Sequence, residues 1–138
     1  MRGTLAQLTA SMPGAQRIAD AGFDKVSTDS RTATAGALFV ALRGETFDAH
    51  DFLPQVAANG AAAVIAERLP EGWTLPAIVV PDTLTALGQI ANHWRRQYAI
   101  PLIGVTGSNG KTTVKEMIAA ILAAAFGEQA RLATQGNL

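Results

Sequence analysis

The feature that most constrains this chain is the octapeptide Thr-Gly-Ser-Asn-Gly-Lys-Thr-Thr at positions 106–113. The apolar residues 101–105 come just before it, include β-branched side chains and predict a buried strand. Helix-forming residues follow from 114 to 126 without a breaker, and Gly127 stands where a C-terminal cap belongs. The sequence therefore predicts a strand, a glycine-rich turn and a helix in succession.

This order of elements favours a phosphate-binding loop. Gly107 and Gly110 carry no side chains, so backbone N–H groups can converge there on a phosphate. The helix N-terminus adds donors and a positive dipole end, Lys111 can reach the β- and γ-phosphates, and Thr112 would place its hydroxyl on Mg²⁺. The strict pattern G-x-x-x-x-G-K-[ST] requires glycine where this chain has Val105. The alternative is an ordinary left-handed turn that carries a solvated lysine.

The composition predicts a folded protein without a charged surface for nucleic acid. Of the 138 residues, 49% are hydrophobic and 16% are charged, which is typical of a globular chain. Eleven basic and eleven acidic residues cancel, so no net field recruits nucleic acid or a membrane surface. With no cysteine, the chain can form neither a disulfide nor a thiolate metal site.

Neither a membrane helix nor a secretory signal is indicated. The longest apolar run, 117–126, is far shorter than the roughly 20 residues that a membrane span needs, and we expect a buried helix there. Polar residues interrupt the N-terminal segment where a signal peptide would need an apolar core. We therefore expect a cytoplasmic protein with no membrane insertion.

Strands and helices alternate before the octapeptide, which predicts an α/β fold with a mainly parallel sheet. Short apolar runs predict strands at 38–42, 62–66 and 78–80. Asp51 and Asp82 are the predicted N-caps of two helices, and the second helix is expected over 82–98. Its predicted buried stripe, at helical spacing, consists of Leu84, Leu87, Ala91, Trp94 and Tyr98.

We expect a domain boundary near Pro81. Residues 1–81 are predicted to form a small N-terminal α/β domain that binds a substrate. Residues 82–138 are predicted to begin a parallel-sheet ATPase domain with its strand, phosphate loop and helix. One such unit, even with a further predicted strand at 131–134, cannot make the several-stranded sheet on which a phosphate-loop domain rests. The second domain is therefore expected to be truncated.

Two polar segments of the first domain are candidate ligand contacts. Residues 27–31, Ser-Thr-Asp-Ser-Arg, suit a polar, phosphate-bearing ligand, but the same residues equally suit an ordinary turn with a surface arginine. The loop 44–51 holds three carboxylates and His50, without the spacing of a metal-ligand set. We therefore expect a ligand-facing loop in which His50 donates or accepts a hydrogen bond.

With these motifs in place, the chain resembles the Mur ligases, the ATP-dependent amide-forming enzymes of bacterial peptidoglycan synthesis. The resemblance rests on the phosphate loop, on Ser-Thr-Asp-Ser-Arg at 27–31 and on Phe-Asp-Ala-His-Asp-Phe at 47–52, and it spans nearly the whole chain. The family's phosphate motif is Thr-Gly-x-x-Gly-Lys-Thr. It matches residues 106–112 and accounts for the missing first glycine.

Three segments resemble the branch that adds D-alanyl-D-alanine to UDP-N-acetylmuramoyl-tripeptide: 38–45, 114–117 and 134–137. The sister ligase that adds the third amino acid shares residues 27–31 and most of the first domain, so it remains the near alternative. A non-catalytic module that binds a UDP-sugar peptide is a further alternative. An unrelated phosphate-loop kinase is a weaker one, because the chain offers neither a lid nor an acceptor site.

The resemblance implies a mechanism and a set of site residues. Family members use ATP and Mg²⁺ to phosphorylate the substrate's terminal carboxylate, and an amine then displaces phosphate from the acyl phosphate. Lys111 is the implied catalytic residue, and Thr112 is the implied Mg²⁺ ligand. The implied ATP-binding residues are Gly107, Ser108, Asn109, Gly110, Lys111, Thr112 and Thr113. The implied UDP-binding residues are Ser30, Arg31, Thr46, His50 and Asn137.

The resemblance also implies a biological setting. The full-length enzyme would be a monomeric acid–amino-acid ligase that serves cell wall biogenesis, and through it cell shape and cell division. A complete central domain and a C-terminal domain would follow this chain and carry the remaining catalytic groups. We therefore expect the isolated 138-residue chain to be inactive.

Overall fold

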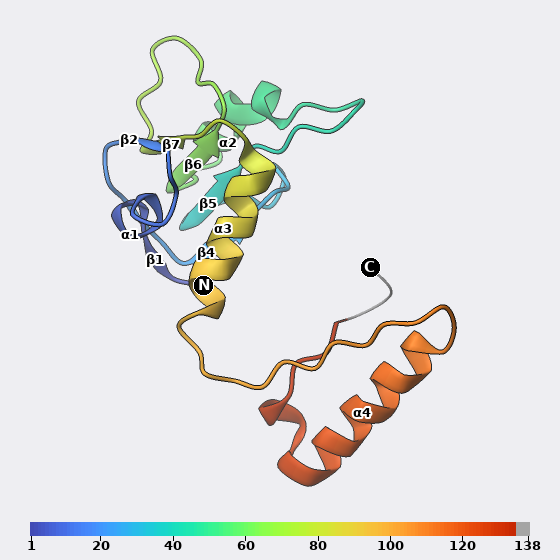
Figure 1. The fold of residues 1–138 in the computed structure, drawn as a ribbon. Coiled ribbons are helices and arrows are strands. Elements are labelled where there is room, and N and C mark those ends of the chain that lie inside the picture. The colour runs from blue at the N-terminus through green and yellow to red at the C-terminus, as the bar shows by residue number, and fades with distance from the viewer. Residues whose placement is uncertain (135–138) are drawn as a thin grey trace. The chain divides into compact units, whose positions relative to one another are not determined.

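The computed structural model describes residues 1–134. The chain divides into two compact units, residues 1–99 and the residues from 100 onward (Figure 1). The first unit is longer than the 1–81 domain expected from the sequence. Its last helix packs into the same core as the first one, through the buried side chains of Ala86 and Ile90. Apolar burial therefore places this helix in the first unit.

A five-stranded sheet in the order β2-β7-β6-β5-β4 forms the centre of the first unit. Its strands are β2 (Gln16–Ile18), β4 (Lys25–Ser27), β5 (Ala37–Val40), β6 (Ala63–Ala66) and β7 (Ala77–Val79). Strands β4 to β7 are parallel to their neighbours, and β2 runs antiparallel to β7. A separate antiparallel pair joins β1 (Gly3–Thr4) to β3 (Gly22–Phe23). The predicted α/β fold with a mainly parallel sheet is confirmed.

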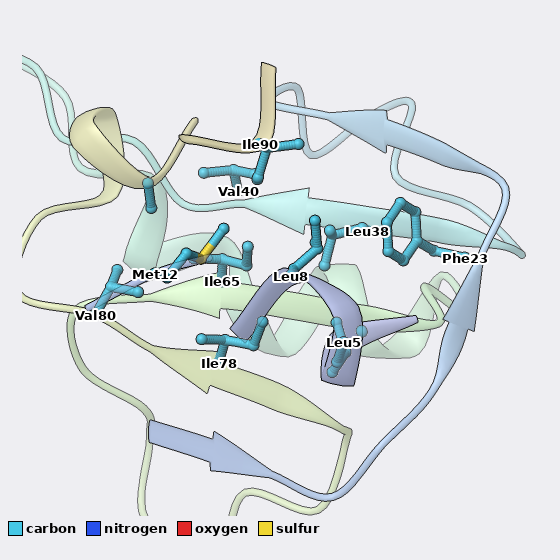
Figure 2. Close-up of a cluster of buried hydrophobic side chains, with 12 residues drawn as sticks. Leu5, Leu8, Met12, Phe23, Leu38, Val40, Ile65, Ile78, Val80 and Ile90 are labelled. Atoms are coloured by element: carbon cyan, nitrogen blue, oxygen red, sulfur yellow. The ribbon is translucent and has the colours of Figure 1, made fainter. Parts of the chain in front are cut away.

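The central strands are buried on both faces, as their continuous apolar sequences require. In β5, Leu38 and Val40 point into one hydrophobic cluster, and Ala37 and Phe39 point into another on the opposite face. The first cluster also receives α1 (Leu5–Thr9) and α3 (Thr83–Arg95), and the second receives α2 (Leu53–Ala58). Figure 2 shows Leu5, Leu8 and Ile90 meeting the strand side chains of the first cluster.

Helix α3 begins where the sequence predicts but buries a different face. Asp82 caps it, accepting the backbone N–H of Thr85 at 2.6 Å. The predicted stripe is wrong for Leu84, which is 68% exposed, and for Ala91 and Tyr98, which are exposed as well. The helix instead buries Thr83, Ala86 and Ile90. These small and medium side chains let the helix approach the sheet, a choice that periodicity alone cannot make.

The predicted cap at Asp51 is also wrong. A 3₁₀ turn, η1 (Ala49–Phe52), comes before α2, and Asp48 is its N-cap. The carboxylate of Asp48 accepts the backbone N–H of His50 at 3.0 Å. Pro54 then lies in the first turn of α2, where its missing N–H is tolerated.

The second unit is built on α4 (Lys111–Phe126), which is followed by a short 3₁₀ turn, η2 (Glu128–Ala130). The strands predicted at 101–105 and 131–134 do not form, because within residues 100–134 no neighbouring extended segment supplies ladder hydrogen bonds. The expectation that 117–126 is a buried helix is wrong as well. Met117 is 59% exposed, and Ala119 is the buried residue of α4. Within the described part of the chain, no helix has the length and hydropathy of a membrane span.

Candidate functional site

The loops that carry the predicted substrate residues lie at one edge of the sheet. Ser30 and Arg31 follow β4, and Thr46 and His50 follow β5. These two strands are parallel neighbours, so both loops leave from the carboxyl edge of the sheet. Open α/β sheets bind ligands at this edge. Asn137, the fifth predicted residue, lies outside the described residues.

The loop after β4 is ordered around Asp29. One oxygen of its carboxylate accepts the backbone N–H of Arg31 at 2.9 Å, and the other accepts Nη2 of the same residue at 2.7 Å. The Ser27 hydroxyl donates to the backbone carbonyl of Asp29 at 3.0 Å. The Arg31 guanidinium lowers the pKa of Asp29 to about 2, and Asp29 raises the pKa of Arg31. The turn expected as one alternative is therefore present, and it presents an oriented cation whose side chain is 82% exposed.

The loop after β5 forms a narrow projection, residues 43–47, which we call the arm (Figure 1, teal). Its ends approach one another: Gly44 N–H donates to the Phe47 carbonyl at 2.7 Å, and Arg43 forms an isolated antiparallel bridge with Asp48. All five arm residues are exposed, including Thr46. The Phe47 ring stacks on Phe52 with 5.4 Å between centroids.

The base of the arm is a polar network centred on His50, which is only 5% exposed. His50 Nδ1 lies 2.6 Å from Asp48 Oδ1, and His50 Nε2 accepts the backbone N–H of Glu67 at 2.9 Å. Arg68 Nη2 donates to Asp48 Oδ2 at 2.7 Å. Hydrogen bonds from the His50 backbone and from Arg68 hold the pKa of Asp48 well below its usual range. His50 thus donates and accepts hydrogen bonds, as the sequence suggested, and its partners in this structure are protein groups.

Sequence reasoning missed Glu67 and Arg68, although a charged pair directly after a buried strand is a usable signal. Both residues follow β6 at the carboxyl edge. Glu67 Oε1 also accepts the backbone N–H of Thr83 at 3.2 Å and its hydroxyl at 3.3 Å. The network thereby reaches the first turn of α3.

Two cavities lie on the first unit. One of about 280 Å³ adjoins the network and is lined in part by His50, Asp51, Pro54 and Arg68. The larger, of about 530 Å³, is at the amino edge of the sheet, beside Phe23 and Gly36. That edge carries none of the predicted substrate residues, so the smaller cavity is the one associated with the candidate site.

The phosphate loop comes directly before α4. Gly110, the N-cap residue, has φ 76° and ψ 0°, a left-handed conformation that favours glycine. A Cβ at Gly110 would meet no heavy atom within 4 Å, so the backbone here is open to approach. Lys111 Nζ donates to the Gly107 carbonyl at 2.5 Å, which brings the ammonium group back over the loop. Open backbone, a helix N-terminus, a lysine and the Thr112 hydroxyl together suit a phosphate with its Mg²⁺ ion.

Two family models match this chain. Residues 23–95 match the model described as Mur ligase family, catalytic domain, and residues 105–138 match the Mur ligase middle domain. The first match alone covers more than half of the chain.

Curated relatives agree with these models. The UDP-N-acetylmuramoyl-tripeptide–D-alanyl-D-alanine ligase of Escherichia coli K12 is 47% identical over 135 residues, which are 98% of this chain and 29% of the relative. The enzyme of the same name from Synechocystis is 50% identical over 105 residues, 75% of this chain and 23% of the relative. The UDP-N-acetylmuramoyl-L-alanyl-D-glutamate–2,6-diaminopimelate ligase of Bacillus cereus is 42% identical over 101 residues, 72% of this chain and 20% of the relative.

Solved structures are similar along much of the chain. A crystal structure of MurF from Acinetobacter baumannii matches with a TM-score of 0.81 and 42% identity, over 90% of this chain and 28% of that one. A MurF ligase from Thermotoga maritima, in complex with ADP, matches with a TM-score of 0.68 and 34% identity, over 72% of this chain and 23% of that one. The chain spans less than a third of the length of these relatives.

Proposed function

Since this chain belongs to the Mur ligase family, we propose that it forms the substrate-binding and phosphate-loop part of a ligase that adds D-alanyl-D-alanine to UDP-N-acetylmuramoyl-tripeptide. The observation that carries the proposal is the 47% identity along 98% of the chain to the E. coli enzyme of that name. The reaction is ATP-dependent amide formation through an acyl phosphate. A cytoplasmic, monomeric enzyme belongs to the same proposal.

The first unit would hold the UDP end of the substrate at the carboxyl edge of its sheet. Arg31 is exposed, oriented by Asp29 and always cationic, so it is suited to a charge-assisted contact with a diphosphate. Ser30 lies beside it, and Thr46 lies on the neighbouring arm. These positions support a polar ligand that bridges the two loops.

The second unit would hold ATP through residues 107–113. The first turn of α4 directs backbone N–H groups toward the loop, and Lys111 adds a positive charge that would neutralise the phosphoryl group in transfer. Thr112 would hold Mg²⁺, which shields the phosphate charges when it is bound. Both roles are positional and electrostatic, which is the main contribution that proteins make to phosphoryl transfer.

Calorimetry with UDP-N-acetylmuramoyl-tripeptide tests the substrate role. Arg31→Ala should weaken binding by about 10-fold or more, the usual effect of losing a charge-assisted hydrogen bond. Arg17→Ala is the matched control, because Arg17 also pairs with a nearby aspartate, Asp20, at 3.2 Å but lies on β2, away from the two loops. Equal affinities in the wild type and the Arg31 variant would remove Arg31 from the site.

The sister ligase is the second candidate, because the B. cereus relative that is named for 2,6-diaminopimelate is 42% identical over 72% of this chain. Both enzymes are named for UDP-N-acetylmuramoyl substrates, so the first unit cannot separate them. The amine that the full-length protein joins decides between D-alanyl-D-alanine and 2,6-diaminopimelate.

A further inference from the structure

We infer that His50 is a positioning residue: it anchors the arm to the end of β6 and does not itself contact the substrate. The claim about the substrate rests on the proposed function. The claim that His50 anchors the arm concerns the protein alone and can be measured without a ligand. Three features of the network support it.

The first feature is that both ring nitrogens of His50 are already used. Nε2 accepts the backbone N–H of Glu67 at 2.9 Å, so it carries the lone pair and the ring proton is on Nδ1. Nδ1 then donates to Asp48 Oδ1, 2.6 Å away. His50 borders the 280 Å³ cavity, but only 2% of its side chain is exposed and both ring nitrogens are engaged, so the imidazole has no free nitrogen to offer a ligand.

The second feature is that the partners of His50 belong to two different loops. Asp48 immediately follows the arm, whereas Glu67 and Arg68 follow β6. Asp48 accepts from the His50 backbone at 3.0 Å, from the His50 ring and from Arg68 at 2.7 Å. One imidazole therefore joins the end of the arm to the edge of the neighbouring strand.

The third feature is that the arm itself is exposed along its whole length, from Arg43 to Phe47. Such a loop is held mainly at its ends, where Arg43 bridges Asp48 and Phe47 stacks on Phe52, so its conformation depends on how its base is held. The base in turn is tied to α3 through Glu67, whose carboxylate accepts two hydrogen bonds from Thr83. Fixing the base of the arm fixes where Thr46 is presented.

Nuclear magnetic resonance on the ligand-free 138-residue chain tests the anchor. We expect the His50 proton on Nδ1, an unprotonated Nε2 and a slowly exchanging Glu67 amide. The Ala49 amide donates to the Leu42 carbonyl at 3.0 Å and so reports on the base of the arm. In His50→Ala, the amides of Glu67 and Ala49 should exchange at least about 10-fold faster, since the anchor is lost. A proton on Nε2 in the wild type, or unchanged exchange in the variant, would overturn the anchor, and the wild-type spectrum decides even if the variant fails to fold.

Titration with UDP-N-acetylmuramoyl-tripeptide then separates positioning from stability. His50→Ala should lose about 10-fold in affinity. The control is Ile90→Val or Ile90→Ala, whichever gives an equal fall in melting temperature, and it should keep its affinity, because the Ile90 side chain extends from α3 into the core. In the wild type, ligand should shift the amide of Thr46 and leave the His50 ring nitrogens unshifted.

Equal affinity losses in the two variants, or a direct shift of the His50 ring nitrogens on binding, would overturn the positioning role. If the wild-type chain does not bind the substrate, the proposed function fails, and the substrate part of the inference fails with it. The ligand-free spectra still decide the anchor by themselves, so the two failures are distinguishable.

Discussion

Two substitutions of Asp48 should destabilise the first unit to different and calculable extents. Its carboxylate caps η1, accepts from the His50 ring and accepts from Arg68. Asp48→Asn keeps a carbonyl oxygen for the cap and for the ring, because asparagine is as good an N-cap as aspartate. Asp48→Ala removes all three hydrogen bonds.

The magnitudes follow from these contacts. Loss of the cap costs about 1 kcal/mol, and loss of the acceptor for the His50 ring about 1–2 kcal/mol more, because that ring is buried. The Arg68 contact contributes little, since the Arg68 side chain is 56% exposed. We therefore expect about 2–3 kcal/mol for Asp48→Ala and about 0.5–1.5 kcal/mol for Asp48→Asn.

The effect of Asp48→Asn should depend on pH. The pKa of Asp48 in the folded state is lower than usual, because the His50 backbone and Arg68 donate to its charged form. The charge therefore stabilises the fold above about pH 4, and this stability is lost as the pH falls toward the folded-state pKa. The gap between wild type and Asp48→Asn should be widest above about pH 5 and should narrow toward about pH 2.

Urea unfolding followed by tryptophan fluorescence measures these differences. Both tryptophans, Trp73 and Trp94, belong to the first unit, so the signal reports on that unit. Equal destabilisation by the alanine and asparagine substitutions would refute the assignment of separate hydrogen bonds. A gap that stays constant from neutral to acidic pH would refute the role of the charge.

Two further predictions concern the first unit's backbone and the chain's activity. Gly36→Ala should destabilise the first unit by about 1–2 kcal/mol, because Gly36 has φ +78° and an added Cβ would lie 2.5 Å from Asp24 Oδ1. In the double variant with Asp24→Ala, the stability lost to the steric clash should return, whereas the stability lost to the positive φ should not. Full recovery of stability in urea unfolding would contradict the backbone contribution. The isolated chain should form no amide from ATP, Mg²⁺, UDP-N-acetylmuramoyl-tripeptide and D-alanyl-D-alanine, since residues 101–105 form no sheet to fix the phosphate loop. The measurements are phosphate release and detection of the amide product by mass. More phosphate and product than a Lys111→Ala control gives would disprove the expected inactivity.

Local sequence was sufficient for the elements whose signals are local. Strands β5, β6 and β7 are predicted because strands buried on both faces must be continuous apolar runs. Asp82 is predicted as a cap, and α4 is predicted after a glycine-rich turn, because capping and left-handed glycine conformations involve only adjacent residues. The family could be recognised for the same reason, since its motifs are contiguous.

Tertiary structure decided the features that depend on distant partners. The face that α3 buries includes the small side chain of Ala86, which lets the helix lie close to the sheet. Residues 101–105 form no strand, because the hydrogen bonds of a β-ladder require a neighbouring strand. Asp48, not Asp51, is the cap because the same carboxylate also meets Arg68, twenty residues away in sequence. His50 is buried because the backbone of Glu67 offers its ring a donor at the end of another strand. A sequence shows which groups a residue can pair with, but only the fold brings one of those partners within hydrogen-bonding distance.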